Sequence, residues 1–405
     1  MIANSLRCAA LLGAIAITGA CSAGGSGNGS TGSGGSGGAP TSSSSSSGSS
    51  SSSSSVSSSS NSSSSSSGEG GGPAMNSVSL LSLNLHCLRL DGTVYATNAD
   101  RFSAIATLVA SRDISAIALQ EACERPGENA LNELRTAIEK ATSATWSSTW
   151  TFAHIAWEGT PDQADEGVGL LVKGALSDPK EMVLAVQGSL RRVATSAMLP
   201  AEWADIRLTS VHFEVFEEAA RKMQAREVAV AALVDTDPGF GAIVAGDFND
   251  IEGSATHTAF PSLGYLAADA GLDAAGIDHI MVHRAAKWRP VKAEKVFLGM
   301  EAVSDHPGIV VRFESAPGDP VTPTRISTLY TPAANQFLSI RGNMTPLTWD
   351  LGFPLHRSTN GTFAFISTEI KNDFEFKLLV NDQTWQTGAN VMGKAGMDQS
   401  VAPTF

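Results

Sequence analysis

The stretch Val78-Ser-Leu-Leu-Ser-Leu-Asn-Leu85 is a short apolar run that predicts a buried strand. A helical stretch from Asp100 to Arg112 follows it, and a second apolar run covers Ile114 to Leu119. The order strand, helix, strand is the beginning of a layered α/β domain.

The same alternation continues as far as Phe313. Amphipathic helices are predicted at Leu131 to Ala141 and Ala219 to Val234. Apolar runs predict strands at Gly167 to Val172, Ala194 to Leu199, Asp205 to Phe213, Gly241 to Gly246, Ile277 to His283 and Gly308 to Phe313. Strands outnumber helices, so much of the sheet must be mixed or antiparallel. We expect an α/β fold over 74–316, in which two sheets pack face to face as a β-sandwich flanked by helices.

A second, smaller domain is expected at the C-terminal end. Gly318 to Ala334 is rich in Pro and Thr and predicts a linker, which we place at 317–333. Beyond it the pattern alternates as in strands, with no helical period, at Phe337 to Arg341, Thr362 to Ile366 and Phe374 to Val380. This pattern predicts a small all-β sandwich over 334–405.

The first 73 residues have a different composition. Arg7 precedes the apolar stretch Cys8 to Ile17, which is too short to span a bilayer, and small residues then lead to Cys21. Residues 1–21 resemble a bacterial lipoprotein signal peptide with Cys21 as the lipidated residue, although Thr18 stands where Leu is usual. Residues 22–73 are mostly Ser and Gly and predict a flexible tether. We expect an exported protein anchored by a lipid, periplasmic or on the cell surface; ordinary secretion is the alternative.

Two of the four cysteines remain once Cys8 is removed with the signal peptide and Cys21 is acylated. Cys87 and Cys123 each follow the end of a predicted strand. They form a disulfide if those strands are neighbours, and are two unrelated buried thiols otherwise.

Composition and charge limit the classes of function. The chain has 405 residues, of which 42% are hydrophobic despite the serine tract, so it can bury a sizeable core. Its 27 Lys and Arg against 40 Asp and Glu give a net charge of −13. This balance disfavours long-range attraction to nucleic-acid phosphate or anionic lipid. Any phosphate chemistry therefore needs a cation.

Polar side chains lie at or directly beyond an end of the predicted strands of the large domain, where they converge at one rim of a sheet. These are Asn84, Gln120-Glu121, His212, Asp247-Phe248-Asn249, Asp278 and Asp305-His306. The acids suit a hard cation such as Mg²⁺, and histidines beside an acid suit proton transfer.

Six motifs in this order resemble the endonuclease/exonuclease/phosphatase superfamily: Leu83-Asn84, Leu119-Gln120-Glu121, His212, Gly246-Asp247-Phe248-Asn249, Ile277-Asp278-His279 and Ser304-Asp305-His306-Pro307. The resemblance implies a deoxyribonuclease I-like fold and a catalytic Mg²⁺ (Mn²⁺ or Ca²⁺ as alternatives) bound by Glu121 with Asn84 and Asp305 beside it. His306 would be the base or electrostatic partner at the attacking water, oriented by Asp278. Asp247 and Asn249 would position the water and the phosphoryl oxygen, and His212 would stabilise or protonate the phosphate.

His279 and the pair Arg191 and Arg192 have other interpretations. His279 alternates to the face of its strand opposite Asp278, so we expect it to be structural. Arg191 or Arg192 is either a phosphate clamp or an ordinary surface charge, and the sequence does not choose between them.

The C-terminal domain resembles starch-binding sandwiches of carbohydrate-binding module family 20, through Trp349-Asp350, Phe374 to Lys377 and Trp385 to Asn390. That resemblance implies that Trp349 and Trp385 stack on glucose rings while Lys377 and Asn390 bind hydroxyls. The domain is shorter than the family norm and Gln386 replaces an expected acid. The alternative is that both Trp are core residues.

These observations predict a metal-dependent phosphoesterase, preferably a phosphodiesterase or nuclease. Its expected substrate is a phosphate ester, either a nucleic acid or a small phosphodiester. A glycan is a further candidate partner, and contact with a membrane is expected only through the lipid anchor. The alternatives are a phosphomonoesterase, a sphingomyelinase-like phospholipase, and a non-catalytic glycan-binding surface lipoprotein.

Overall fold

The computed structural model describes residues 77–405 except 204 and 273–274. The predicted signal peptide, the lipidation site Cys21 and the Ser/Gly tether lie outside the described residues. Within the described part of the chain, no helix is long and apolar enough to cross a membrane.

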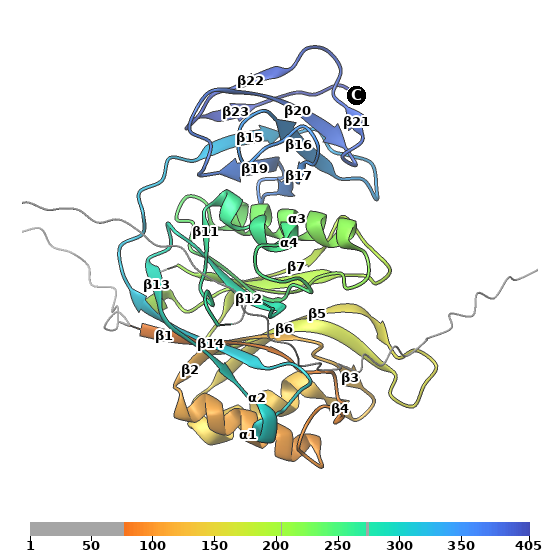
Figure 1. The fold of residues 1–405 in the computed structure, drawn as a ribbon, viewed down its shortest axis with the longest axis vertical. Helices are drawn as coiled ribbons and strands as arrows, with labels where there is room; N and C mark the ends of the chain where they lie inside the picture. The colour runs from red at the N-terminus through yellow and green to blue at the C-terminus, as the bar shows by residue number, and fades with distance from the viewer. Residues whose placement is uncertain (1–76, 204, 273–274) are drawn as a thin grey trace, which may run out of the picture. The chain divides into compact units, whose positions relative to one another are not determined.

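Two sheets face each other in the large domain (Figure 1). The first has eight strands in the order β13-β14-β1-β2-β6-β3-β4, with β5 pairing to β6. Its strands are β1 Ser77–Asn84, β2 Ile114–Gln120, β3 Glu124–Arg125, β4 Glu128–Asn129, β5 Trp146–Ala156, β6 Ala164–Lys173, β13 Trp288–Val296 and β14 Gly308–Ser315. Only β1 and β2 run parallel in it, because an α-helix connects them.

The second sheet has six strands in the order β11-β12-β10-β9-β8-β7. Its strands are β7 Ser177–Val183, β8 Val193–Met198, β9 Arg207–His212, β10 Ala242–Asp247, β11 Tyr265–Ala267 and β12 Asp278–His283. Here β9 and β10 are the parallel pair, again joined by a helix.

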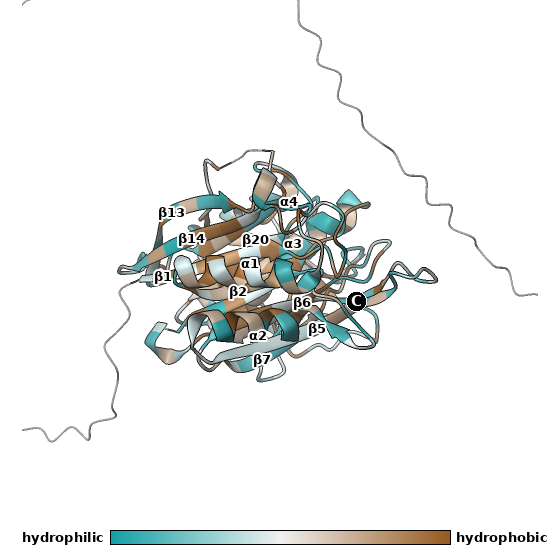
Figure 2. Cartoon of the chain, turned by 90° about the horizontal axis from the view of Figure 1, so that it is seen from below, coloured by the Kyte–Doolittle hydropathy of each residue, from teal (hydrophilic) through white to brown (hydrophobic). Residues whose placement is uncertain are grey.

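Helices cover the outer faces of the two sheets. The helices are α1 Asn98–Ser111, α2 Ala130–Thr142, α3 Glu218–Thr236 and the short α4 Ala255–Thr258, with 3-10 turns at Ala201–Trp203, Pro261–Leu263 and Gly299–Glu301. Helices α1 and α2 lie side by side over the first sheet, with teal and brown faces as expected of amphipathic helices (Figure 2). Helix α3 packs on the second sheet through Val228 and Leu233.

The period-two alternation of the strands explains how one rim collects the polar residues. In β1, Val78 and Leu80 point into the core between the sheets while Leu81 and Leu83 face the helices. Asn84 therefore points to the same side as Leu80, at the end of the strand. The same alternation places His212 and Asp247 at the ends of β9 and β10, and Asp278 at the start of β12, all on the inner face. The predicted α/β fold with two facing sheets is confirmed.

The C-terminal region forms two further sheets, in the orders β18-β19-β15-β23 and β17-β16-β20-β21 with β22 on β20. The strands are β15 Thr324–Thr328, β16 Leu338–Gly342, β17 Phe353–Pro354, β18 His356–Arg357, β19 Phe363–Ser367, β20 Phe374–Val380, β21 Thr384–Trp385, β22 Val391–Gly393 and β23 Asp398–Ser400. The predicted all-β sandwich is present. Its first strand, β15, lies inside the segment 317–333 that we predicted as a linker, so the sandwich begins earlier than expected.

Helix α3 has apolar contacts on two sides. One buried cluster contains Phe213 and Phe248 from the large domain, Val228 and Leu233 from α3, and Phe353 from the C-terminal sheets. The Arg226 guanidinium donates to the carbonyls of Leu351 (2.7 Å) and Gly352 (3.2 Å), and lies 4.5 Å from the centre of the Phe353 ring. The C-terminal sandwich therefore shares a core with the large domain.

Candidate active site

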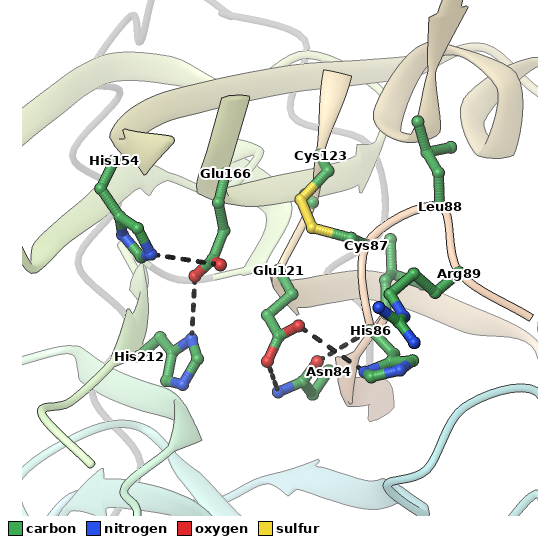
Figure 3. Close-up of a disulfide and its surroundings, with 12 residues drawn as sticks. Asn84, His86, Cys87, Leu88, Arg89, Glu121, Cys123, His154, Glu166 and His212 are labelled. Carbon is green, nitrogen blue, oxygen red and sulfur yellow. Dashed lines mark hydrogen bonds and ion pairs between the residues drawn. A yellow bond between two sulfur atoms is a disulfide. The ribbon is translucent and has the colours of Figure 1, made fainter. Parts of the chain in front are cut away.

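Asn84 joins the two sheets at the polar rim (Figure 3). Its Nδ2 donates to Oε1 of Glu121 at 3.0 Å and to Oδ2 of Asp247 at 3.2 Å, so it links β1, the end of β2 and β10. Glu121 directly follows β2 and has a left-handed backbone (φ 47°). The alternation of the strand therefore does not predict the direction of its side chain. These contacts bring three of the predicted residues together.

Asp278 and His306 form a second group beside Asp247. Nδ1 of His306 is 2.9 Å from Oδ2 of Asp278, and Nε2 of His306 is 3.8 Å from Oδ2 of Asp247. Burial lowers the pKa of His306, but the hydrogen bond and charge of Asp278, with the charges of Asp247 and Asp305, raise it to about 10. These three carboxylates therefore favour the charged form of His306.

His212 also approaches Asp247, with Nε2 at 3.6 Å from Oδ2, the oxygen that His306 approaches. Its Nδ1 is 3.5 Å from Oε1 of Glu166, which also lies 3.5 Å from Nη1 of Arg192. Burial, and then the charge of Arg192, lower the pKa of His212 to about 3. The pKa values of the two histidines beside Asp247 therefore shift in opposite directions.

Gly246 and Asn249 fix the orientation of Asp247. A Cβ on Gly246 (φ 155°) would lie 2.0 Å from the carbonyl oxygen of Val211, so only glycine permits this approach of β10 to β9. After Asp247, the backbone N–H of Asn249 donates to Oδ1 of Asp247 at 2.8 Å, and Nδ2 of Asn249 donates to the carbonyl of Phe213 at 3.0 Å. The side chain of Asp247 thus forms an Asx turn that the N–H of Asn249 closes, and this contact fixes the carboxylate.

Asp305 lies at the outer edge of the site, with its side chain 44% exposed. It contacts His86, whose Nδ1 is 3.2 Å from Oδ2 of Asp305 and 3.9 Å from Oε2 of Glu121. His86 therefore bridges the two predicted acidic metal ligands.

Cys87 and Cys123 form a disulfide that lies above Glu121 in Figure 3. β1 and β2 are neighbours, which is the condition that the sequence set for this bond. The backbone N–H of Cys87 also donates to the carbonyl of Glu121 at 3.1 Å. The two loops that carry Asn84 and Glu121 are therefore held together covalently and by a hydrogen bond.

Three residues of the site were missed or left open by sequence reasoning: His86, Glu166 and Arg192. His86 follows Asn84 by two positions, and that spacing was the available signal. Arg192 is 2% exposed and pairs with Glu166, so it is no surface charge. Arg191, in contrast, donates to the carbonyls of Phe152 (2.6 Å) and Ala153 (2.8 Å), a structural role. His279 binds Asp269 (Nδ1 to Oδ2, 2.9 Å) on the far face, in agreement with the structural role we expected.

The donor set fits a divalent cation. Ligand atoms of Asp247, Asp278 and His306 lie within 4.8 Å of one another. Asn84 links Glu121 to this group through its hydrogen bonds to Glu121 and Asp247. Burial and the charge of Glu166 raise the pKa of Glu121 to about 8, because its negative charge lacks compensation. Oδ1 of Asp278 is buried with no hydrogen-bond partner among the described residues. Oxygen donors and uncompensated negative charge are what a hard cation requires.

The predicted carbohydrate platform is only partly assembled. Trp349 and Trp385 are neighbours, with ring centres 6.1 Å apart and planes at 42°, and Trp385 is 41% exposed. Lys377, however, donates to the carbonyls of Gln386 (3.0 Å) and Gly388 (2.7 Å), and Asn390 donates to Glu375 at 2.8 Å. Both polar residues are thus engaged within the domain, Lys377 by carbonyls of the segment that follows β21 and Asn390 by a side chain of β20.

A family model, described as the endonuclease/exonuclease/phosphatase family, matches residues 81–306, which hold the whole rim from Asn84 to His306. The chain belongs to the endonuclease/exonuclease/phosphatase family. Membership of this family makes the protein, in general terms, a divalent-metal-dependent phosphoesterase. No curated protein matches the chain.

Among solved structures, the chain is similar to an endonuclease/exonuclease/phosphatase from Beutenbergia cavernae, with 13% identity over 79% of this chain and 100% of the other, at a TM-score of 0.50. It is also similar to an endonuclease/exonuclease/phosphatase family protein from Leptotrichia buccalis (19% identity; 58% and 99% of the two chains; TM-score 0.48). The human nocturnin catalytic domain is a third (15%; 60% and 94%; TM-score 0.47). The Beutenbergia structure supports the family fold.

Proposed function

We propose that the protein is a phosphodiesterase of this family that hydrolyses a phosphodiester by attack of water. The observation that carries the proposal is the convergence of two histidines on Asp247, with Nε2 of His212 at 3.6 Å and Nε2 of His306 at 3.8 Å from its Oδ2. In-line phosphoryl transfer needs a group that accepts the proton of water and a cation on the phosphoryl oxygens. The polar rim supplies the proton acceptor as Asp247 and carries acidic residues that could hold the cation.

Each residue then has a distinct role. Asp247, oriented by the Asn249 turn, accepts the proton of the attacking water. His306, held by Asp278, stabilises the negative charge that develops on the phosphoryl oxygens, and neutral His212 hydrogen-bonds the phosphate from the opposite side. A divalent cation held by Asn84, Glu121 and Asp305 would neutralise further charge at the phosphate.

A space that could take part of a substrate borders one side of this rim, at Asp278, Asp305 and His306. A cavity of about 320 Å³ is lined by Asp278, Asp305, His306 and Lys295. A cavity of this size suits one small group attached to a phosphate better than a nucleic-acid duplex. The acidic charge of the chain agrees, because duplex binding relies on many phosphate contacts.

The test measures hydrolysis of plasmid DNA, RNA, bis(p-nitrophenyl) phosphate, p-nitrophenyl phosphate and sphingomyelin by the full chain, with Mg²⁺, with Mn²⁺ and with EDTA. The Asp247→Ala, His306→Ala variant is the inactive comparison. Asp113→Asn, which changes an exposed carboxylate away from the site, is the matched control.

Cleavage of a diester that stops with EDTA and in the double variant, and continues in the control, supports the proposal. Cleavage of monoesters only would replace it with a phosphomonoesterase, and of sphingomyelin only with a phospholipase. Metal binding without turnover of any substrate would favour the non-catalytic alternative.

We also propose export, with Cys21 as the lipid-bearing residue. The supporting observations are the short apolar segment after Arg7 and the small residues before Cys21. Labelling of the chain with radioactive palmitate in a bacterial host, lost in Cys21→Ala, is the expected result. Equal labelling of both chains would exclude this site.

Glycan binding by the C-terminal sandwich remains a separate proposal, supported by the adjacent Trp349 and Trp385. Because Lys377 and Asn390 are engaged internally, we assign the contact to the two rings alone. Retention on immobilised starch should fall in Trp385→Ala. Unchanged retention would remove the platform.

A further inference from the structure

The proposed function gives no role to His86, although its ring lies between two acidic residues of the site. Nδ1 is 3.2 Å from Oδ2 of Asp305 and 3.9 Å from Oε2 of Glu121. Two adjacent ligands of an octahedral ion with bonds of about 2.1 Å are about 3.0 Å apart, and two opposite ligands about 4.2 Å. The distance from Nδ1 to each carboxylate in turn therefore lies within the range that separates two ligands of one cation.

The other ring nitrogen has a carboxylate beside it, at an ion-pair distance without the geometry of a hydrogen bond. Nε2 lies 3.3 Å from Oδ2 of Asp91. Arg89 holds both oxygens of Asp91, through Nε at 2.7 Å and Nη2 at 2.8 Å. A carboxylate on one nitrogen of an imidazole fixes the tautomer that leaves the other nitrogen's lone pair for a metal.

The ring is also fixed from its backbone. The N–H of His86 donates to Oδ1 of Asn84 at 2.9 Å, and the backbone is left-handed at both His86 (φ 49°) and Cys87 (φ 52°). The Trp157 ring packs edge-on against the imidazole, with centres 6.0 Å apart and planes at 81°. These contacts, with the adjacent disulfide, hold Nδ1 toward Glu121 and Asp305.

We infer that Nδ1 of His86 is a ligand of the catalytic cation, beside Glu121 and Asp305, and that the site therefore prefers a transition-metal dication to Mg²⁺. The inference rests on the proposed function only for the existence of the cation. Imidazole nitrogen suits transition metals, whereas Mg²⁺ takes oxygen ligands and releases its water reluctantly.

The experiment binds Mn²⁺ to the metal-free full chain and measures it by electron paramagnetic resonance. The spin-echo modulation reports a coordinated imidazole nitrogen, and the signal of free Mn²⁺ gives the Kd. His86→Gln keeps a polar side chain and removes the imidazole. His356→Gln, in the C-terminal sandwich, is the matched control, and Asp91→Asn tests the supporting carboxylate.

Nitrogen modulation is expected in the wild type and in His356→Gln, and not in His86→Gln. We expect His86→Gln to weaken Mn²⁺ binding by about tenfold or more, while Mg²⁺ binding, measured calorimetrically, changes by less than about threefold. Asp91→Asn should weaken Mn²⁺ binding with the modulation retained. Near-UV circular dichroism verifies that each variant is folded.

Bound Mn²⁺ without nitrogen modulation, or modulation that survives in His86→Gln, overturns the inference. Neither result depends on turnover, so the proposed function stands or fails separately. Nitrogen modulation in a chain that hydrolyses no phosphate ester would leave His86 as a ligand and refute the phosphodiesterase.

Discussion

Nδ1 of His306 lies 2.9 Å from Oδ2 of Asp278, although 28 residues separate them in the chain. The contact joins the start of β12 to the loop before β14 and so crosses from one sheet to the other. An imidazole whose position depends on one carboxylate acts with it as a unit.

Removing the Asp278 carboxylate should therefore lower kcat nearly as much as removing the His306 imidazole. We expect Asp278→Asn to lower kcat by about 10²- to 10⁴-fold, and Asp278→Asn with His306→Ala to be no slower than His306→Ala alone. The measurement is kcat on a diester at saturating metal. Effects that multiply in the double variant would show that the two residues act independently.

Metal binding should stabilise the fold, because it relieves repulsion among buried acids. Saturation at 100 times the Kd contributes about 2.7 kcal/mol, which calorimetry detects as a higher Tm. Glu121→Gln should melt above the wild type without metal at pH 8, since the raised pKa marks a carboxylate that is costly to bury. The same variant should lose most of the metal-induced rise. The control is Glu158→Gln, an exposed position where both Tm values should match the wild type.

The Cys87–Cys123 disulfide should support both the fold and the metal site. It closes a loop with a sequence separation of 36 residues, so its loss is expected to cost about 4 kcal/mol of unfolding free energy. Because it ties the loops of Asn84 and Glu121 together, we also expect weaker Mn²⁺ binding in Cys87→Ala, Cys123→Ala. Dithiothreitol should reproduce both losses in the wild type and leave the double variant unchanged. Lower stability with an unchanged Kd would limit the bond to a structural role.

Glu227 on α3 should make the fold less stable as the pH rises. Burial raises its pKa to about 8, while its two oxygens accept from the N–H of Ala185 at 3.0 and 2.8 Å. A carboxyl whose pKa is higher in the folded state stabilises the fold below its unfolded pKa of about 4.3. That stability is lost as the pH rises towards 8. Denaturant unfolding between pH 5 and pH 9 should show a smaller decline in Glu227→Gln. Glu218→Gln, exposed on the same helix, should keep the wild-type slope; equal slopes in both variants would contradict the assignment.

The sequence was sufficient for the inner-face residues of the strands. Asn84, His212, Asp247 and Asp278 continue a period of two, so their strands predict both their direction and their common rim. His86 was not predictable in this way, because it follows a strand in a left-handed turn and alternation does not extend through such a turn. Glu166 meets Arg192 and His212 only through sheet pairing and sheet packing, which residue types do not specify.

The missed strands have a similar physical explanation. β5, β7 and β13 are half-exposed and mix Ser, Thr, Lys and Glu with apolar residues, so no continuous apolar run marks them. β15 was hidden because Pro and Thr surround it, although it pairs with β19 and β23. Pairing partners far away in the chain decide such strands.

The burial of α3 on two sides has a consequence for how the molecule unfolds. The sandwich and the outer face of the second sheet share one apolar cluster through this helix, so we expect them to unfold together. A scanning calorimeter should record a single endotherm for the folded region, and a protease should find no resistant fragment that ends between β14 and β15.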